Sequence, residues 1–375
     1  MNSTVILYVS IYLLTTLFAI KSQARSSVGQ VYFKWRWLVA SFMIHWVFLC
    51  FTNISVDYKN YMRIILNVSF ENLFLDSEIA FNGLCLILKC LFKSPDIVIF
   101  FIKSITLLIF YKCFIMLRNN VSLGLSVLAY NLLLYLQGFL ILGMQLAIAL
   151  LFLSIIYIER GDIKRSLFLL IVACSVHSST ILFVPIFILY LIINSRKHKM
   201  RGKFICVLSV SYVIIYIFMG KLLNWAINTI PQFSQYKIYH MIDKYSGLGI
   251  MQIVFFIPIF YFIFLLYRND IDNSIKNLAI ICSITAFLFA MLGYKIEVFS
   301  RINTNFIMIY SFFIPVLFFE RKYKCQVNHR YIFNYRSDLM IWIVYILIRG
   351  LDVFINMGLT TSSAMINPYV FYWPF

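Results

Sequence analysis

The stretch LVASFMIHWVFLCF, residues 38–51, decides the fold class, because it carries no charged residue. Similar apolar stretches recur along the whole chain, close to the ~20 residues that an α-helix needs to cross a bilayer. Of the 375 residues, 62% are hydrophobic and only 12% are charged. A helix keeps its backbone hydrogen bonds internal, as a lipid environment requires. We therefore predict an all-α polytopic membrane protein with a single integral-membrane domain, 1–375.

The apolar stretches predict about twelve crossings. They lie near 4–20, 37–53, 95–111, 121–138, 142–158, 166–178, 179–193, 204–219, 250–267, 276–293, 303–319 and 338–351. A further stretch, 78–92, is shorter, and we expect it to be an interfacial or re-entrant helix beside the site. The first stretch has no basic region before it and no small-residue cleavage site, so we expect a retained helix.

The net charge of +18 mainly reports orientation. Lys and Arg concentrate in cytoplasmic loops, and most of the 32 basic residues fall in one alternate set of loops. That set is assigned to the cytoplasm, so both termini are expected on the outer side. The outward segments are then 54–94, 220–249, 294–302 and 352–375. Because orientation accounts for most of the positive charge, we predict no nucleic-acid partner.

The sequence lacks the common signatures of metal and nucleophile chemistry. Its eight cysteines are spread singly, and no CxxC or Cys/His metal spacing occurs. There is no GxSxG elbow, no Walker loop and no HExxH. We therefore predict no metal and no cofactor, and any chemistry is expected to be metal-independent.

Directly after the stretch 38–51 comes ISVDYKNYMR, residues 54–63. If this segment is helical, Asp57 and Tyr61 share a face, with Tyr58 beside it and Arg63 on another. Carboxylates and aromatic rings together suit a sugar, which offers hydroxyls and apolar ring faces. The alternative is interfacial anchoring, because tyrosines sit at headgroup level and long basic side chains snorkel.

A second group lies in GYKIEVFSRINTNF, residues 293–306, at the outward mouth of a predicted span. Charges at membrane depth are by default functional candidates. Glu297 and Arg301 are four residues apart, and an arginine can hold a phosphate through two parallel hydrogen bonds. The alternative is a structural Glu–Arg pair, worth only ~0.3–0.5 kcal/mol if exposed.

Two further segments combine polar groups of useful chemistry. In CSVHSST, residues 174–180, His177 is a candidate proton shuttle or phosphate donor, although a lone histidine can equally be a packed residue. The loop IPQFSQYKIYHMIDKYSG, residues 230–247, holds Lys244 and Tyr245 among other aromatic and charged residues. It suggests a surface for a glycan or a lipid phosphate, or simply a wet loop at the membrane surface.

Taken in order, these motifs resemble the EpsG-like Wzy polysaccharide polymerases of bacteria over most of the chain. VDYKNY resembles the family's DY-x-x-Y segment, and DSEIAFNGL brings Glu78 before a short helix. GMQLAIALLFLSI (143–155) resembles the RQ-type helix through Gln145, but Met144 stands where the family often has arginine. The remaining matches are FLLIVACSVHSSTILFVPI (168–186), KYSG (244–247), SRINTNF (300–306) and NPYVFY (367–372).

The resemblance implies a function and a place for it. Such polymerases act on undecaprenyl-diphosphate-linked oligosaccharides at the outer leaflet of the inner membrane, so the active site is expected to face the periplasm. They move the growing glycan from its carrier to a hydroxyl of a new repeat unit and release undecaprenyl diphosphate. A GT-C-like architecture and a separate chain-length regulator are also expected by analogy.

Roles for individual residues follow from that chemistry. Arg301 is expected to hold the departing diphosphate, with Lys244 and Arg63 as helpers. His177 would hydrogen-bond a phosphate or deprotonate the acceptor hydroxyl, and Asp57 is the rival base or a sugar ligand. The predicted substrate-binding residues are Tyr58, Tyr61, Arg63, Lys244, Tyr245, Gln145 and Glu297.

Three other functions remain open on the sequence. An O-antigen ligase would share the donor but use a lipid A-core acceptor. A lipid-linked oligosaccharide flippase would need a cavity lined by cations, and the two similar halves that are typical of flippases are absent here. A membrane acyltransferase would need a histidine near an arginine on the acyl-donor side, where His198 and His329 make a weak case.

Overall fold

The structure is a computed structural model whose described residues form two compact units. The described residues are 3–25, 31–74, 77–117, 122–195, 210–212, 214, 217, 218, 221, 225, 228, 229, 250–268, 273–295, 299, 303, 305, 306, 335–355, 366 and 368–375. Unit 1 comprises 1–181 and 310–375, and unit 2 comprises 182–309. A single membrane domain stays a prediction.

Unit 1 is a bundle of helices with one small two-stranded sheet. Its elements are α1 (Ser3–Ser22), β1 (Gln23–Arg25), β2 (Val31–Phe33), α2 (Trp35–Cys50), α3 (Tyr58–Asn67), α4 (Ile79–Phe92), α5 (Pro95–Met116), α6 (Leu123–Tyr130), the π-helix η1 (Asn131–Tyr135), the 3-10 helix η2 (Leu136–Phe139), α7 (Leu142–Glu159), α8 (Ile163–Val176), the 3-10 helix η3 (Ser178–Leu182) and α15 (Tyr335–Phe354). The antiparallel pair β1–β2 has Ala24 opposite Tyr32.

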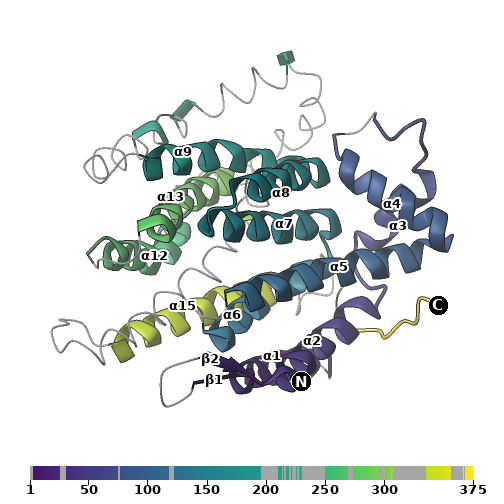
Figure 1. Ribbon diagram of the computed structural model, residues 1–375, viewed down its shortest axis with the longest axis horizontal. Helices are drawn as coiled ribbons and strands as arrows, with labels where there is room; N and C mark the ends of the chain where they lie inside the picture. The colour runs from purple at the N-terminus through teal and green to yellow at the C-terminus, as the bar shows by residue number, and fades with distance from the viewer. Residues whose placement is uncertain are drawn as a thin grey trace. The chain divides into compact units, whose positions relative to one another are not determined.

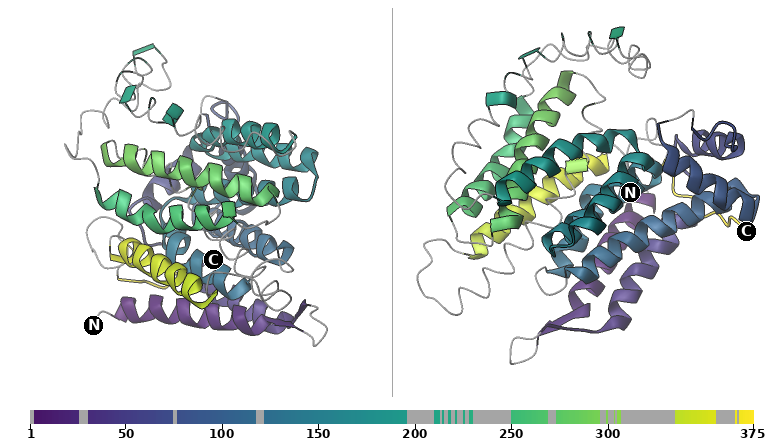
Figure 2. Two further views of the ribbon diagram at one scale, coloured as in Figure 1. Left: turned by 90° about the vertical axis from the view of Figure 1, so that its left-hand side faces the viewer. Right: turned by 45° about the horizontal axis from the view of Figure 1, so that its top comes forward.

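The two ends of the helix bundle in unit 1 carry different elements (Figure 1). At one end, the β1–β2 hairpin joins α1 to α2, and the Gln23 side chain accepts a hydrogen bond of 2.9 Å from the Leu123 amide. At the other end lie α3, α4 and the C-terminal segment, beside the start of α5 (Figure 2). Among the described residues, the hairpin with Lys34 and the turn after α7, where Arg160 donates to the Met116 carbonyl at the end of α5, lie at the end opposite α3 and α4.

Unit 2 is built from α9 (Phe183–Ser195), α12 (Ile250–Arg268) and α13 (Asn273–Lys295), of which α13 packs against both others. Phenylalanine rings fill its interior. Phe306 stacks on Phe289 with ring centroids 5.5 Å apart and on Phe183 at 5.9 Å. The Tyr212 hydroxyl and the Thr285 hydroxyl are 2.6 Å apart, which satisfies two polar groups among these apolar residues.

The described helices confirm a helical protein rich in apolar segments, as the sequence predicts. Two of them, Ser3–Ser22 and Pro95–Met116, are long and apolar enough to cross a bilayer unaided. Shorter apolar helices occupy most of the other predicted spans, and 166–193 forms two separate helices. The predicted spans 204–219 and 303–319 lie mostly outside the described residues. The number of crossings and the GT-C-like arrangement stay predictions.

A buried polar network joins α1, α2, α5 and η1. His45 is fully buried, with Nδ1 2.9 Å from the Tyr111 hydroxyl and Nε2 2.6 Å from Asn131 Oδ1. The Asn131 amide nitrogen donates to the Thr15 hydroxyl at 2.9 Å, and Ser41 donates to the Thr15 carbonyl at 2.9 Å. Buried polar groups are costly unless they are paired, so these bonds fix how the helices meet.

The predicted span 121–138 is not one regular helix, because α6 passes into a π-helical turn at Asn131. A π turn is a single wider turn within a helix, and such turns are rare but frequent at functional sites. Here α1 and His45 hold Asn131. From the other side, α15 packs closely on η1, since a Cβ on Gly350 would lie 2.5 Å from Leu132 Cδ2.

We predict that Gly350→Ala destabilises the protein by about 1–3 kcal/mol, the usual cost of overpacking. The new methyl group would also lie 2.7 Å from Leu132 Cβ, which belongs to a rigid turn. Thermal unfolding of the purified protein in detergent measures the effect. Gly83→Ala is the matched control, because its nearest neighbour is 4.0 Å away. Equal melting temperatures for the two variants would refute the close packing of α15 on η1.

Candidate functional site

At the end of unit 1 that carries α3 and α4, a histidine and a carboxylate meet. His177 Nδ1 hydrogen-bonds Glu78 Oε1, and the two side chains are 28% and 26% exposed. These exposures leave both groups held by protein but still open to a substrate. The two residues are far apart in the sequence, so folding alone brings them together.

Local backbone structure places His177 at the end of a helix. α8 ends at Val176, and His177 takes the extended values φ −148° and ψ 122° while its amide still donates to the Ala173 carbonyl at 3.0 Å. The Thr180 hydroxyl donates to the His177 carbonyl at 2.7 Å, so a backbone acceptor freed by the helix end is satisfied. The imidazole is thereby presented from a fixed backbone.

Glu78 occupies the corresponding position at the start of α4, where it is the N-cap residue. A carboxylate is favoured there by the partial positive charge of the helix N-terminus. A carboxylate can only accept, so His177 Nδ1 is the donor of this hydrogen bond and Nε2 is the ring nitrogen left for another partner. Among the described residues, no side chain hydrogen-bonds that Nε2. This arrangement can take a proton from a hydroxyl group.

Asp57 and Tyr61 lie near this pair, on α3 and its N-cap position. The amide of Tyr61 donates to the Asp57 carbonyl at 3.0 Å, which confirms the helical turn that the spacing predicts. The amides of Leu142 and Gly143, in the first turn of α7, lie within hydrogen-bonding reach of the Tyr61 hydroxyl. Burial, and then the charge of Asp57, raise the pKa of Tyr61 above its ordinary value, so the phenol stays neutral.

Tyr58 contacts two charged residues of α5, Asp96 and Lys103. Its hydroxyl donates to Asp96 Oδ1, and the Lys103 ammonium lies 5.9 Å from the centre of its ring. Lys103 is only 3% exposed, and it donates to the Thr52 carbonyl at 3.2 Å. Buried charges in a membrane protein are rare and mark functional regions by default.

Sequence reasoning missed Asp96 and gave Lys103 no role. The segment Ser94–Pro95–Asp96 has the signal of a helix start, with a capping residue, proline at the first position and an acid in the first turn. That signal predicts where α5 begins, but not that Tyr58 meets its carboxylate. Only the packing of α3 on α5 shows that contact.

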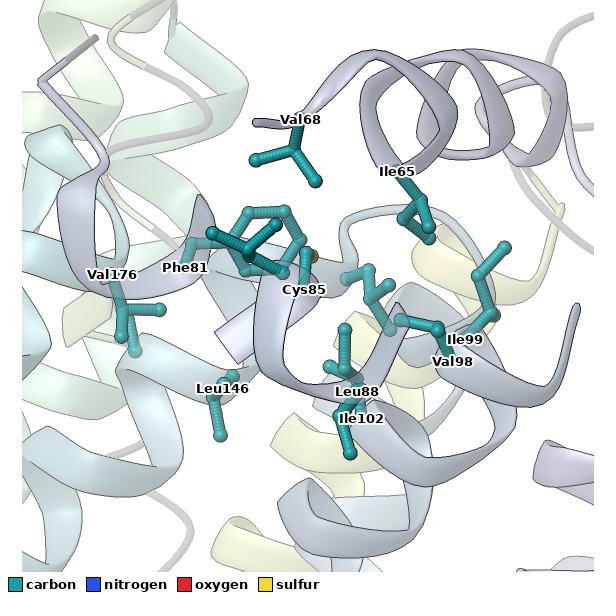
Figure 3. Close-up of a cluster of buried hydrophobic side chains, with 13 residues drawn as sticks. Ile65, Val68, Phe81, Cys85, Leu88, Val98, Ile99, Ile102, Leu146 and Val176 are labelled. Carbon is teal, nitrogen blue, oxygen red and sulfur yellow. The ribbon is translucent and has the colours of Figure 1, made fainter. Parts of the chain in front are cut away.

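The helices that carry these polar groups share a cluster of buried apolar side chains (Figure 3). It joins α3, α4, α5, α7 and α8 through thirteen buried residues. They are Ile65, Val68, Phe81, Cys85, Leu86, Leu88, Val98, Ile99, Ile102, Leu142, Leu146, Ala147 and Val176. Tyr58 and Tyr61 pack against this cluster. Lys89 also donates to the Leu66 carbonyl at 2.6 Å, so α3 is held on α4 at its far end.

Two predicted site residues in the described part have no hydrogen bond or ion pair with His177 or Glu78. Gln145 is buried and donates to the Leu134 carbonyl at 3.3 Å, inside the π-helical turn. Arg63 is exposed on α3, and the described residues give it no ion pair. Both assignments to substrate stay predictions.

The remaining predicted site residues, Arg301, Glu297, Lys244 and Tyr245, lie outside the described residues. Their roles therefore stay predictions from the sequence. Within the described residues, no three His, Cys, Asp or Glu side chains come together as a metal site.

Comparison with known proteins gives one match. No curated protein and no solved structure matches the chain. The model of the EpsG family matches residues 35–371, which includes every site residue named above. Because that match covers nearly the whole chain, the protein belongs to the EpsG family.

Proposed function

We propose that the protein is a surface polysaccharide polymerase of the O-antigen type. In this proposal it transfers the growing glycan from undecaprenyl diphosphate to a lipid-linked repeat unit, at the outer face of the cell inner membrane. One observation carries the proposal: a half-buried histidine–carboxylate pair lies beside two tyrosines at the helix ends opposite the basic turns. Membership of the EpsG family supports a role in polysaccharide biosynthesis.

The histidine–carboxylate pair supplies the base for this transfer. His177 Nε2 takes the proton of the acceptor hydroxyl, whose oxygen bonds to the anomeric carbon of the donor sugar. The bond from that carbon to the diphosphate oxygen breaks, and the electron pair leaves with the diphosphate. Glu78 fixes the tautomer of His177 and stabilises the imidazolium that forms. General base catalysis of this kind contributes about 10²–10⁴-fold in rate.

The departing diphosphate requires positive charge on the same side of the membrane. The sequence assigns Arg301 to this task, with Lys244 and Arg63 as helpers, because these cations are predicted to face outward. A donor placed where charge develops commonly contributes ~2.7–4 kcal/mol to the transition state. No metal is required in this scheme.

The tyrosines supply binding surface for the sugars. Burial and the hydrogen bond with Asp96 raise the pKa of Tyr58 well above its ordinary value, and Tyr61 is likewise held neutral. The Tyr61 hydroxyl can donate to a sugar oxygen, whereas the Tyr58 hydroxyl gives its proton to Asp96 and can only accept. Both rings can present apolar faces to a sugar. Asp57, at the start of α3, is the second candidate base or a ligand for a sugar hydroxyl.

An O-antigen ligase and a lipid-linked oligosaccharide flippase are the two alternative functions. An O-antigen ligase would use the same base and the same donor, with a lipid A-core acceptor. A flippase moves its cargo without breaking a bond, so a histidine–carboxylate pair in it would relay protons and would not deprotonate a sugar hydroxyl. The gene deletion below separates the two functions. A partner that regulates chain length is a further expectation from the family resemblance.

Deletion of the gene tests the function. In an organism with an outer membrane, a polymerase deletion should leave lipid A-core that carries one repeat unit, which a lipopolysaccharide gel resolves. Loss of a ligase or a flippase should leave bare core, and loss of an acyltransferase should leave the full ladder. A full ladder after deletion would refute the proposed function. In an organism without an outer membrane, the same test reads capsule or exopolysaccharide length.

We predict that His177→Gln lowers polymerisation by about 10²–10⁴-fold, since the base is lost. Glu78→Gln should lower it by about 10–100-fold, because a neutral amide no longer stabilises the imidazolium. Turnover of a purified lipid-linked repeat unit measures both effects. Glu71→Gln is the matched control, since Glu71 is exposed in a turn of the same outward segment. If Glu78→Gln lowered the rate in the His177→Gln background by as much as it does in the wild type, Glu78 would not act through His177.

We predict that Arg301→Ala removes the polymer ladder while the protein level is kept, because the diphosphate loses its main cation. The expected loss in rate is about 100-fold or more. Arg336→Ala, at the start of α15 and predicted to be cytoplasmic, is the matched control. An intact ladder in Arg301→Ala would take Arg301 out of the mechanism.

A further inference from the structure

Two tyrosines from distant parts of the chain lie near the carboxylate of Asp96. The Tyr58 hydroxyl donates to Oδ1. Burial, and then the nearby charge of Asp96, raise the pKa of Tyr372. Tyr58 begins α3, and Tyr372 belongs to the C-terminal segment that lies beside the start of α5 (Figure 1). Asp96 thus connects the C-terminal segment to a residue of the proposed glycan site.

The C-terminal segment is docked by specific contacts along its length. Its hydrogen bonds run from the Tyr372 amide to the Phe51 carbonyl at 2.9 Å, from the Tyr369 hydroxyl to the Phe48 carbonyl at 3.1 Å and from the Tyr8 hydroxyl to the Ile366 carbonyl at 2.8 Å. Phe51 also stacks against Phe371 and Trp373, with ring centroids 5.6 and 5.0 Å apart. The segment therefore presents Tyr372 at a fixed position.

Tyr58 needs such support, because its own helix is short. α3 has 10 residues, and an isolated helix of that length is marginal. Its first turn is also held weakly, since the Tyr58 amide donates to the Ser55 carbonyl at 3.3 Å. On one side the ring faces the ammonium of Lys103, and at its tip the hydroxyl meets Asp96. These two contacts restrict the orientation of the ring.

We propose that Asp96 and Tyr372 are positioning residues of the glycan site, which hold the ring of Tyr58 in the orientation that a sugar requires. The inference rests on the proposed function, in which Tyr58 contacts the glycan. It makes the C-terminal segment a part of the site, although Tyr372 is far from Tyr58 in the sequence. Asp96 acts through Tyr58 and does not itself touch the reacting atoms.

A different explanation is that the aromatic C-terminal segment only anchors the protein at the membrane surface. Tyrosine and tryptophan are enriched at such interfaces, and Phe371 and Trp373 are exposed. Anchoring would make Asp96 a structural acceptor with no tie to glycan affinity. The two explanations differ in whether the effects of Asp96 and Tyr58 on glycan binding are coupled.

A double-mutant cycle between Asp96→Asn and Tyr58→Phe tests the proposal. The readout is the affinity of the full-length protein, in detergent, for a purified undecaprenyl-diphosphate-linked repeat unit. Asp96→Asn should weaken binding about tenfold, as expected for loss of a hydrogen bond to a charged group. In the Tyr58→Phe background, Asp96→Asn should cost less than about twofold, since the hydroxyl that it holds is already gone.

Tyr372→Phe provides a second variant, which keeps the ring and its packing. It should weaken binding about threefold and raise KM more than it lowers kcat, because an orientation and not a reacting group is lost. The matched controls are Tyr32→Phe, an exposed tyrosine of β2, and Asp352→Asn, a half-exposed acid at the end of α15. Both controls should bind like the wild type.

The outcomes separate this inference from the proposed function. If the wild type makes polymer but Asp96→Asn costs the same with and without the Tyr58 hydroxyl, the positioning role is wrong and the polymerase stands. If the cycle shows coupling but no polymer forms, the positioning role stands and the polymerase is wrong. An unchanged affinity in both Asp96→Asn and Tyr372→Phe would also overturn the positioning role.

Discussion

The hydrogen bonds of His45 and Asn131 set the frame on which the candidate site depends. Lipid tails are as apolar as the helix faces, so burial of apolar surface does little to fix how membrane helices meet. Polar side chains that must find partners away from water do so much more strictly. Because His45 and Asn131 bind α1, α2, α5 and η1 together, they fix the relative heights of these helices. The ends of α2 and α5 at which Phe51 and Asp96 lie are set by the same bonds.

The polar groups at the end of the bundle that carries α3 and α4 lie where helices begin or stop. Glu78 precedes α4, Asp57 precedes α3, Asp96 is in the first turn of α5, and His177 follows α8. Helix ends have unpaired backbone groups and local dipoles that favour such residues. The apolar cluster that these helices share gives a rigid base that the ends alone could not provide. The buried apolar residues between the helices thus contribute stability, while the polar residues at the helix ends provide the reactive groups.

The sequence predicts the helices well, because long apolar runs dominate the pattern. It also selects His177, Asp57, Tyr58 and Tyr61, which the structure brings to one end of the bundle with Glu78. It could not predict the His177–Glu78 contact or the contact of Tyr58 with Asp96, since both depend on how separate helices pack. It also missed the π turn, because a single extra residue leaves no trace in a hydrophobic pattern.

That π turn has a geometric consequence beyond its own five residues. Successive residues of an α-helix are separated by about 100° around the axis, so one additional residue in a turn rotates everything after it by that angle. Phe139 comes after the turn, and its ring faces the ammonium of Lys103 at 5.8 Å. The rotation that the π turn gives to the residues after it, as much as their identity, therefore decides which aromatic ring faces Lys103.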